Sequence, residues 1–161
     1  MATVTTPFKR QILEGESLDH AATLLQQSLT DLVDLALLLK QAHWNVVGKN
    51  FRSVHLQLDE ILLTVRDASD EVAERLSALG VSPDGRAKTV AQQSNLGTYP
   101  DNFQDVSATV TAVADSMKTA IEGIRGAIEK LGDLDPVSED MMIGISGPLE
   151  KHLWMVQAQE V

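Results

Sequence analysis

Two pairs of residues with the chemistry of metal ligands occur in one segment of the chain: His55 with Asp59, and Asp70 with Glu74. Each pair is spaced four positions apart, which in a helix places both side chains on one face about one turn apart. The eleven positions from Asp59 to Asp70 return a helix to within about 20° of its starting direction. The spacing therefore predicts one helix with four metal-ligating side chains along a single side.

The same spacing excludes a metal site made by one copy of this helix alone. Eleven residues rise roughly 16 Å along a helix axis, whereas metal–ligand bonds measure about 2 Å. Two arrangements remain: another helix of the same chain completes each pair, or a second copy of the helix packs antiparallel about a two-fold axis near Thr64 and Val65. We favour the second, because it brings His55 and Asp59 of one copy to Asp70 and Glu74 of the other and leaves no ligand unused.

A further histidine strengthens this interpretation. His43 precedes the predicted turn between two helices by about as many residues as His55 follows it, so the two lie at nearly equal height in a helical hairpin. His43, His55 and Asp59 then form one half of a site, and Asp70 and Glu74 of a neighbouring subunit form the other. Imidazoles combined with carboxylates suit ferrous iron better than the compact cages of zinc or the oxygen-only sites of calcium. A single pair of carboxylates at this spacing usually lies on a solvent-exposed helix face. The prediction therefore depends on all five residues fitting the same arrangement of two subunits.

Four long helices and an extended crossover must position these residues. Apolar residues recur at helical spacing after Ser17, a predicted N-cap, and a terminating glycine ends this first helix. A second helix is predicted from Phe51 to Leu79, and the short link before it makes the two an antiparallel hairpin. The segment 81–101 contains proline and glycine, is too long for a bundle turn, and is compatible with a short helix at 89–94.

A second hairpin follows this crossover. The third helix is predicted at 102–131, and the fourth begins at an N-cap, Asp135, followed by Pro136 at the first helical position. Pro148 and the two glycines before it should weaken or kink this last helix. Two hairpins joined by one long crossover are the ferritin-like arrangement of a four-helix bundle. We therefore predict an all-α fold with one such domain.

Composition and charge limit the classes of function. The 161 residues are 43% hydrophobic and include no cysteine, which excludes disulfides and thiolate metal sites. No apolar run approaches the roughly 20 residues of a membrane span, and the N-terminus lacks the apolar stretch of a secretory signal, so we expect a cytoplasmic protein. The net charge of -10 opposes binding to nucleic acid and attracts cations. We assign residues 1–16 to a flexible N-terminal arm and 17–161 to the bundle.

The residues around the predicted ligands resemble a known family. The segment Lys40–Gly48 (KQAHWNVVG), then Phe51, His55 and Asp59, and then Asp70–Arg75 (DEVAER) are similar to the Dps proteins, the DNA-protection-under-starvation miniferritins of bacteria. The resemblance implies a hollow, dodecameric shell of the ferritin-like superfamily. Such a shell takes up Fe²⁺, oxidises it at dimer interfaces with hydrogen peroxide in preference to oxygen, and stores ferric mineral, which protects against oxidative damage.

The resemblance also assigns roles to individual residues. It places iron ligands, for one iron or a pair of irons, at the five positions already named, and it gives Trp44 a role in quenching radicals formed beside the centre. Packing within the hairpin core is an equally compatible role for Trp44. The family's three-fold pore, through which iron enters, lies near the turn between the third and fourth helices, and acidic rings in pores select cations. The acidic residues of this turn are Asp133, Asp135, Glu139 and Asp140, although helix capping also accounts for Asp135 and Glu139.

The family name also implies binding to DNA, and here the sequence departs from the pattern. DNA-binding members commonly use a tail rich in lysine or arginine, whereas this N-terminal arm has only Lys9 and Arg10 and the last five residues have no basic side chain. We therefore predict weak or absent DNA binding. Two alternatives stay open: a DNA-compacting protein with weak iron chemistry, which the charge opposes, and a metal-dependent amide or ester hydrolase on the same scaffold. His20 and His152 are assigned to no site.

Overall fold

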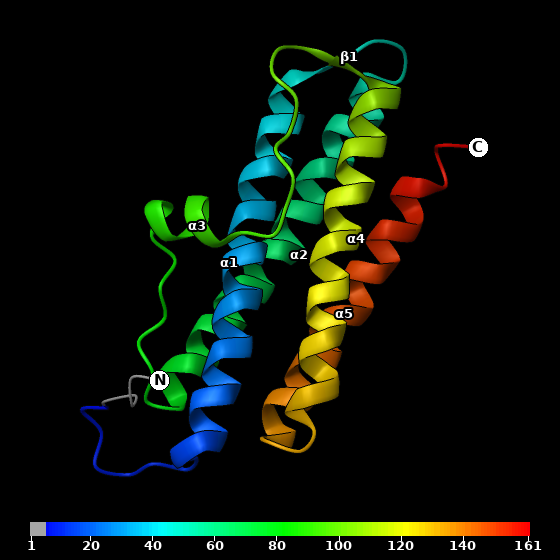
Figure 1. Cartoon of the computed structure of the whole chain (residues 1–161). Helices are drawn as coiled ribbons and strands as arrows, with labels where there is room; N and C mark the ends of the chain where they lie inside the picture. Colours follow the sequence, from blue (N-terminus) through cyan, green and yellow to red (C-terminus); the bar gives the residue numbers. More distant parts are fainter. Residues whose placement is uncertain (1–5) are drawn as a thin grey trace.

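The computed structural model describes residues 6–161, which form a four-helix bundle with a short extra helix in the crossover (Figure 1). The long helices are α1 (Gly15–Asn45), α2 (Phe51–Ala78), α4 (Val106–Leu131) and α5 (Pro136–Gln157). The shorter elements are β1 (Val46–Val47), α3 (Ala87–Gln93) and β2 (Gln104–Asp105). The predicted all-α bundle of two hairpins joined by a long crossover is confirmed.

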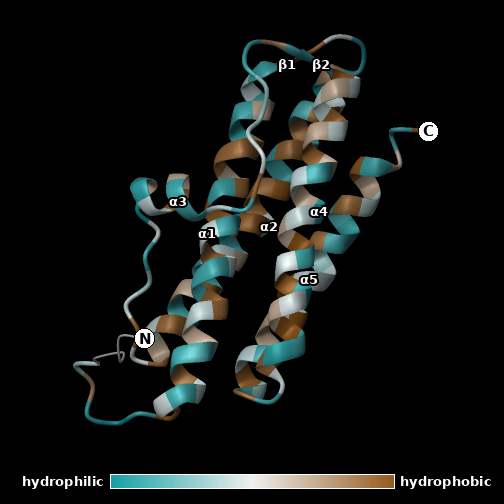
Figure 2. Ribbon diagram, viewed as in Figure 1, coloured by the Kyte–Doolittle hydropathy of each residue, from teal (hydrophilic) through white to brown (hydrophobic). Residues whose placement is uncertain are grey.

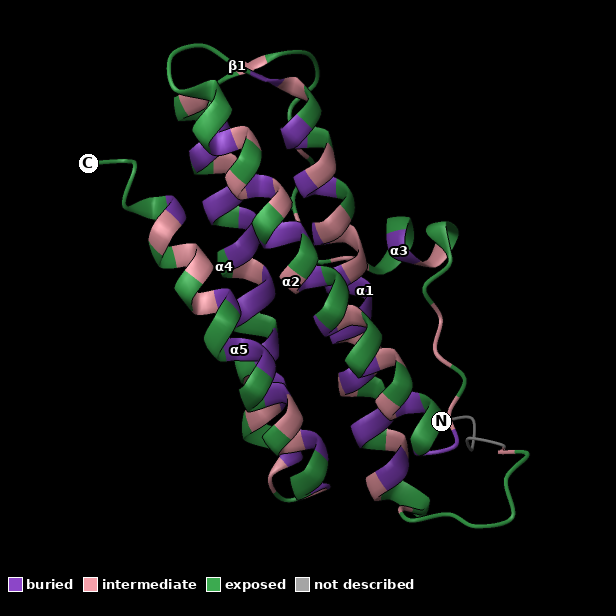
Figure 3. Ribbon diagram, turned by 180° about the vertical axis from the view of Figure 1, so that it is seen from behind, coloured by how far each residue is buried: buried purple, intermediate pink, exposed green. Residues whose placement is uncertain are grey.

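The bundle is held together by apolar stripes that the helices turn toward one another. Hydrophobic residues line the inner sides of the helices in Figure 2, and buried residues follow the same stripes in Figure 3. Fully burying one leucine or isoleucine side chain contributes about 1.5–3 kcal/mol, so this core is the main source of stability. Its largest fully buried members are Leu25, Leu32, Leu35, Leu39, Ile61, Leu76, Leu79, Met117, Ile124, Leu131, Met142 and Leu149.

The ends of the first hairpin differ slightly from the prediction. Helix α1 begins at Gly15 with Glu14 at the N-cap, so the prediction of Ser17 as the N-cap is wrong. Gly15 has a φ of 64°, which glycine adopts without strain and which turns the chain into the helix earlier. Residues 6–14 precede the helix without regular secondary structure, whereas the rest of the predicted arm, 1–5, lies outside the described residues.

Helix α2 ends close to the predicted position because a glycine closes it. Gly80 has a φ of 83°. Its N–H donates to the Ser77 carbonyl at 2.9 Å, and the N–H of Val81 donates to the Leu76 carbonyl at 2.9 Å. This pair of bonds is the Schellman motif, which satisfies carbonyls that the helix itself leaves unpaired.

The crossover is fastened to α1 by side chains. The amide of Gln26 donates to the Asp84 carbonyl at 2.9 Å and accepts from the Asp84 N–H at 2.9 Å. Farther along, the buried Asp31 carboxylate accepts from the backbone N–H of Asn95 at 2.8 Å and from its side chain at 3.1 Å. The short helix α3 lies between these two attachments, close to the predicted 89–94. The crossover therefore has a defined path along the bundle.

The crossover ends in a short parallel pairing that the sequence analysis did not predict. Val46 and Val47 of β1 pair with Gln104 and Asp105 of β2. Because these residues are extended, α4 begins at Val106 rather than at the predicted residue 102. The Asp105 carboxylate then accepts from the Ala108 N–H at 2.8 Å and caps the helix.

Two helices contain features that bear on other expectations. Helix α5 stays helical through Pro148, so the predicted weakening there does not end it. Within residues 6–161, α1 alone is long and apolar enough to cross a membrane by length and composition. However, 56% of its apolar stretch is buried inside the bundle, against α2 and α4. Core packing therefore accounts for the apolar character of α1.

Candidate metal centre

Two predicted ligands, His43 and His55, face each other at the hairpin end of α1 and α2. Their rings are stacked, with centroids 3.7 Å apart and planes inclined by 22°. The Nδ1 of His43 lies 2.9 Å from the carbonyl oxygen of His55, and the Nδ1 of His55 lies 2.9 Å from the carbonyl oxygen of His43. A carbonyl only accepts, so each Nδ1 carries a proton and donates it, and in the neutral form of each ring the lone pair is then on Nε2. A second hydrogen bond that fixes the tautomer in this way is typical of metal-binding histidines.

Asp59 lies one helical turn beyond His55 and next to the imidazole pair. Its Oδ1 atom is 3.3 Å from the Nδ1 of His43 and 2.7 Å from the Nζ of Lys40. The Lys40 ammonium, which donates a hydrogen bond to this carboxylate, lowers the pKa of Asp59, and the nearby His43 acts in the same direction. Asp59 is therefore an anion at neutral pH, which is the form that binds a metal ion.

The other two predicted ligands lie farther along α2. Asp70 and Glu74 are exposed on the same helix, and within residues 6–161 neither has a hydrogen bond or an ion pair to another residue. No set of three His, Asp or Glu side chains gathers as a metal-binding cluster in the described part of the chain. Within a single chain His43 stacks on His55 and contacts Asp59, but the three do not converge into a metal-binding set. Asp70 and Glu74 lie farther along α2, as the length of the helix requires.

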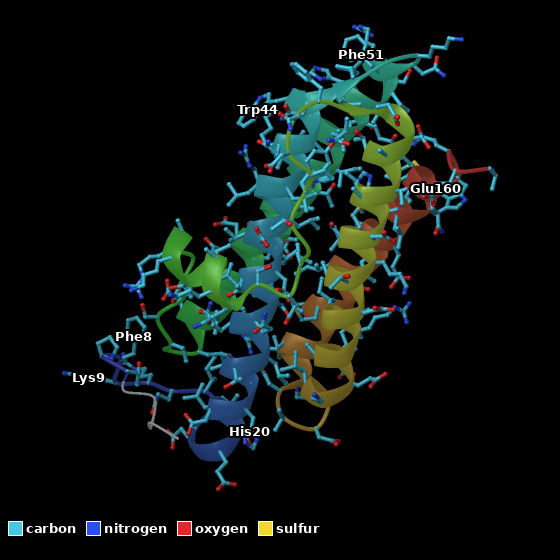
Figure 4. All side chains as sticks on the ribbon, turned by 45° about the horizontal axis from the view of Figure 1, so that its top comes forward. Phe8, Lys9, His20, Trp44, Phe51 and Glu160 are labelled. Carbon is cyan, nitrogen blue, oxygen red and sulfur yellow. The ribbon has the colours of Figure 1, made fainter. Side chains whose placement is uncertain are left out.

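Trp44 does not belong to the core of the single chain. Its side chain is 65% exposed at the same end of the bundle as Phe51 (Figure 4). The alternative that Trp44 packs inside the hairpin is therefore wrong for an isolated subunit. The indole lies beside the candidate centre, with the Nζ of Lys40 6.0 Å from its ring centroid. It also lines an open hollow of 620 Å³ between α1 and the crossover, together with Leu37 and Tyr99.

The acidic residues of the turn between α4 and α5 differ in their exposure to solvent. Asp135 is buried, and its Oδ2 accepts from the Nη2 of Arg75 at 2.6 Å and, at close range, from the Ser138 hydroxyl. Burial raises the pKa of Asp135, but the bonds from Arg75 and Ser138 outweigh burial and lower it overall. Asp133 and Asp140 are exposed instead. Asp135 is the N-cap residue of α5 as predicted, but its carboxylate makes no capping bond to a backbone N–H and is held by Arg75 and the Ser138 hydroxyl instead.

Glu139, the remaining acidic residue of this turn, is half-buried. Its carboxylate lies over Gly132, so close that a Cβ atom at this glycine would come within 3.0 Å of the Glu139 Oε1. A side chain at position 132 would therefore displace the carboxylate. Glu139 therefore lies against the turn, whereas Asp133 and Asp140 are the two acidic residues of the turn that are open to solvent.

The sequence analysis did not identify Lys40 as the partner of the predicted ligand Asp59, or Arg75 as the partner of Asp135. Lys40 precedes His43 by about one helical turn, so the sequence indicated that Lys40 lies near this histidine. Its contact with Asp59, however, depends on how α1 and α2 are aligned. The two unassigned histidines lie away from the centre. His152 shares a 2.9 Å hydrogen bond with the Thr64 hydroxyl, and its burial between α2 and α5 lowers its pKa. His20 lies at the opposite end of the bundle from Trp44 (Figure 4).

Comparisons with known proteins agree with this fold and these residues. Residues 22–160 match the ferritin-like domain family. The DNA protection during starvation protein of Mycolicibacterium smegmatis is 40% identical over 153 residues, which cover 95% of this chain and 84% of that protein. The structure of Mycobacterium smegmatis Dps in a tetragonal form has a TM-score of 0.90 at 40% identity and covers 96% of this chain and 94% of that one. Dps from Microbacterium arborescens in the high iron form has a TM-score of 0.87 at 30% identity, and the match covers 93% of this chain and 98% of that one. The chain therefore belongs to the ferritin-like family and, within it, to the Dps proteins.

Proposed function

We propose that this Dps protein is an iron-storing miniferritin that oxidises Fe²⁺ at centres shared between two subunits. The observation that carries this proposal is the paired arrangement of His43 and His55. Each ring donates from Nδ1 to the other residue's carbonyl, and the Asp59 carboxylate lies 3.3 Å from the Nδ1 of His43. Imidazoles held in this way next to an anion suit a divalent transition metal.

The exposed face of α2 supports a second copy as the source of the missing ligands. Leu56 and Leu63 are 42% and 63% exposed, and they lie on the same side of the helix as Asp59, Asp70 and Glu74. Leu63 is midway between the two pairs of predicted ligands, next to the proposed two-fold axis. Exposed leucines in the middle of a polar face favour a protein partner there. A two-fold partner would cover both leucines and bring Asp70 and Glu74 to the partner's His43, His55 and Asp59.

The chemistry at such a centre is redox chemistry, with Fe²⁺ as the substrate. The carboxylates attract Fe²⁺ and stabilise Fe³⁺ more strongly, and the two Nε2 atoms complete the ligand set. Hydrogen peroxide accepts one electron from each of a pair of Fe²⁺ ions, takes up protons, and leaves as water. The exposed Trp44 indole beside the centre is placed to donate an electron to any radical that escapes this reaction. Peroxide is the preferred oxidant in this proposal.

The remaining parts of the proposal concern the assembly. We infer a cytoplasmic, dodecameric shell with the mineral inside, supported by the similarity to Dps proteins over nearly the whole chain. Fe²⁺ would enter past the exposed Asp133 and Asp140, with Glu139 beside them. The similar Microbacterium protein is described in a high iron form, which supports iron as the metal of this family.

The relatives are named for the protection of DNA. In this protein, that protection would come from the oxidation and storage of iron rather than from binding to DNA. The chain has 13 basic residues against 23 acidic ones, so its surface repels phosphate. Consuming Fe²⁺ together with peroxide withholds both reagents of hydroxyl-radical formation. We therefore propose that DNA binding is weak or absent.

The proposal is tested by mixing the purified protein with Fe²⁺ and hydrogen peroxide and following ferric absorbance. The wild-type protein should oxidise Fe²⁺ rapidly. A variant that combines His43→Ala with Asp70→Asn should lose the rapid phase while keeping its helical circular dichroism. Unchanged kinetics in this variant would refute the proposed ligands. The matched control is Lys118→Met, which changes an exposed residue on α4 and should leave the rate unchanged.

A further inference from the structure

A lysine occupies a position that a metal ion would compete for. Lys40 lies on α1, one turn before His43, and its ammonium reaches across to α2. Its Nζ is 2.7 Å from the Asp59 Oδ1, the length of a strong charge-assisted hydrogen bond. The side chains of Lys40 and Asp59 are 27% and 44% exposed, so this contact is partly shielded from water on the lysine side.

The ammonium is held at the carboxylate from more than one side. The Trp44 ring, one turn along the same helix, lies 6.0 Å from Nζ, at the outer limit of a cation–π interaction. The His43 imidazole, also on α1, contacts the same carboxylate oxygen. The Lys40 side chain therefore lies among the predicted ligands and does not extend into solvent.

A fixed positive charge at a metal ligand opposes binding of a second cation. A divalent ion bound to Asp59 would either share the carboxylate with the Lys40 ammonium, at short range and in partly buried surroundings, or displace it. Both alternatives weaken binding relative to a site with a neutral residue at position 40. A centre that passes oxidised iron to a store must also release it, and weak binding favours release.

From these contacts we infer that Lys40 is an affinity-setting residue of the centre, whose ammonium competes with the metal ion for Asp59. This inference rests on the proposed function, because it takes Asp59 as a metal ligand. Lys40 is a positioning residue and not a catalytic one, since it acts through the carboxylate. Its role is to keep the metal affinity of the centre low.

The test is titration of the assembled, metal-free protein with Co²⁺, which peroxide-free buffer leaves unoxidised. Isothermal calorimetry gives the affinity, and visible absorption reports the ligand field. Lys40→Met, which keeps the chain length and removes the charge, should bind Co²⁺ at least tenfold more tightly than the wild type. Lys40→Arg keeps the charge and should bind like the wild type. Lys118→Met, an equal change of net charge at an exposed site, should also leave binding unchanged.

The outcomes distinguish this inference from the proposed function. Equal or weaker Co²⁺ binding by folded Lys40→Met would overturn the role of Lys40, and Lys40→Gln provides a second neutral variant if Lys40→Met does not fold. Equal tightening in Lys118→Met would also overturn it, because overall charge would then explain the effect. In contrast, wild-type affinity in the variant with His43→Ala and Asp70→Asn would refute the proposed centre itself.

Discussion

Replacing Asp135 by asparagine removes the negative half of an ion pair that joins the end of α2 to the beginning of α5. The side chains of Arg75 and Asp135 are 14% and 11% exposed, and their charged atoms are 2.6 Å apart. Removing one partner of a buried pair typically costs about 3–5 kcal/mol, because the other charge stays buried without its counterion. The Ser138 hydroxyl still accepts from the Arg75 Nε at 2.8 Å, so we place the loss at the lower end, about 3 kcal/mol.

This loss should be visible in thermal unfolding followed by circular dichroism at one fixed protein concentration. For a chain of this size, about 3 kcal/mol corresponds to a decrease in melting temperature of roughly 6–12 °C. The variant Arg75→Met should behave similarly, and combining it with Asp135→Leu should recover part of the loss, because no charge is then left buried. The exposed pair Lys118–Glu122 is the matched control, and breaking it should cost only about 0.3–0.5 kcal/mol.

The same pair predicts the direction of a pH dependence. The pKa of Asp135 is lowered in the folded protein, so its contribution is complete above the unfolded pKa of about 3.9 and is lost as the pH falls below it. Asp135→Asn should therefore flatten the acid limb of the stability curve below about pH 4. A melting temperature within about 2 °C of the wild type at neutral pH would refute the reasoning, because the buried charges would then not depend on each other.

Three further predictions follow from the surface of the chain. Leu63→Glu should weaken self-association in sedimentation velocity, because it places a charge next to the proposed two-fold axis, whereas Lys118→Glu should not; an unchanged sedimentation coefficient for Leu63→Glu would contradict the interface. Replacing Asp133 and Asp140 together by asparagine should slow Fe²⁺ uptake several-fold at low ionic strength and less at high salt, and equal rates would remove these residues from the entry route. A gel-shift assay at about 150 mM salt and neutral pH should show no retarded DNA band, and clear retardation would overturn the argument from charge.

The helices and their pairing could be predicted because local signals determine them. Apolar spacing identified all four long helices, and the short link before Phe51 identified the first hairpin. The start of α4 was misplaced because the pairing of β1 with β2 joins residues 46–47 to residues 104–105. No local pattern reveals a two-residue strand whose partner lies more than fifty positions away.

The candidate site could be predicted in part for the same reason. The pairs His55–Asp59 and Asp70–Glu74 repeat at helical spacing, so their common face was readable from the sequence. The contact of Lys40 with Asp59 and that of Arg75 with Asp135 cross between helices. Both contacts depend on how far one helix is shifted along its neighbour. The pattern of apolar residues does not determine that shift precisely enough to predict which side chains meet. The sequence therefore predicted Asp135 as an N-cap but not its burial against Arg75.

The central claim is that each centre takes ligands from two subunits, and complementation between two inactive variants tests it most directly. One variant carries His43→Ala and Asp59→Asn, and the other carries Asp70→Asn and Glu74→Gln. Each alone should lack rapid, peroxide-dependent Fe²⁺ oxidation. After the two are unfolded and refolded together in equal amounts, half of the two-fold pairs should be mixed and each mixed pair should have one intact centre, which restores about a quarter of the wild-type rapid phase. A co-assembled mixture, verified by mass spectrometry, that stays as inactive as either variant alone would contradict the shared centre.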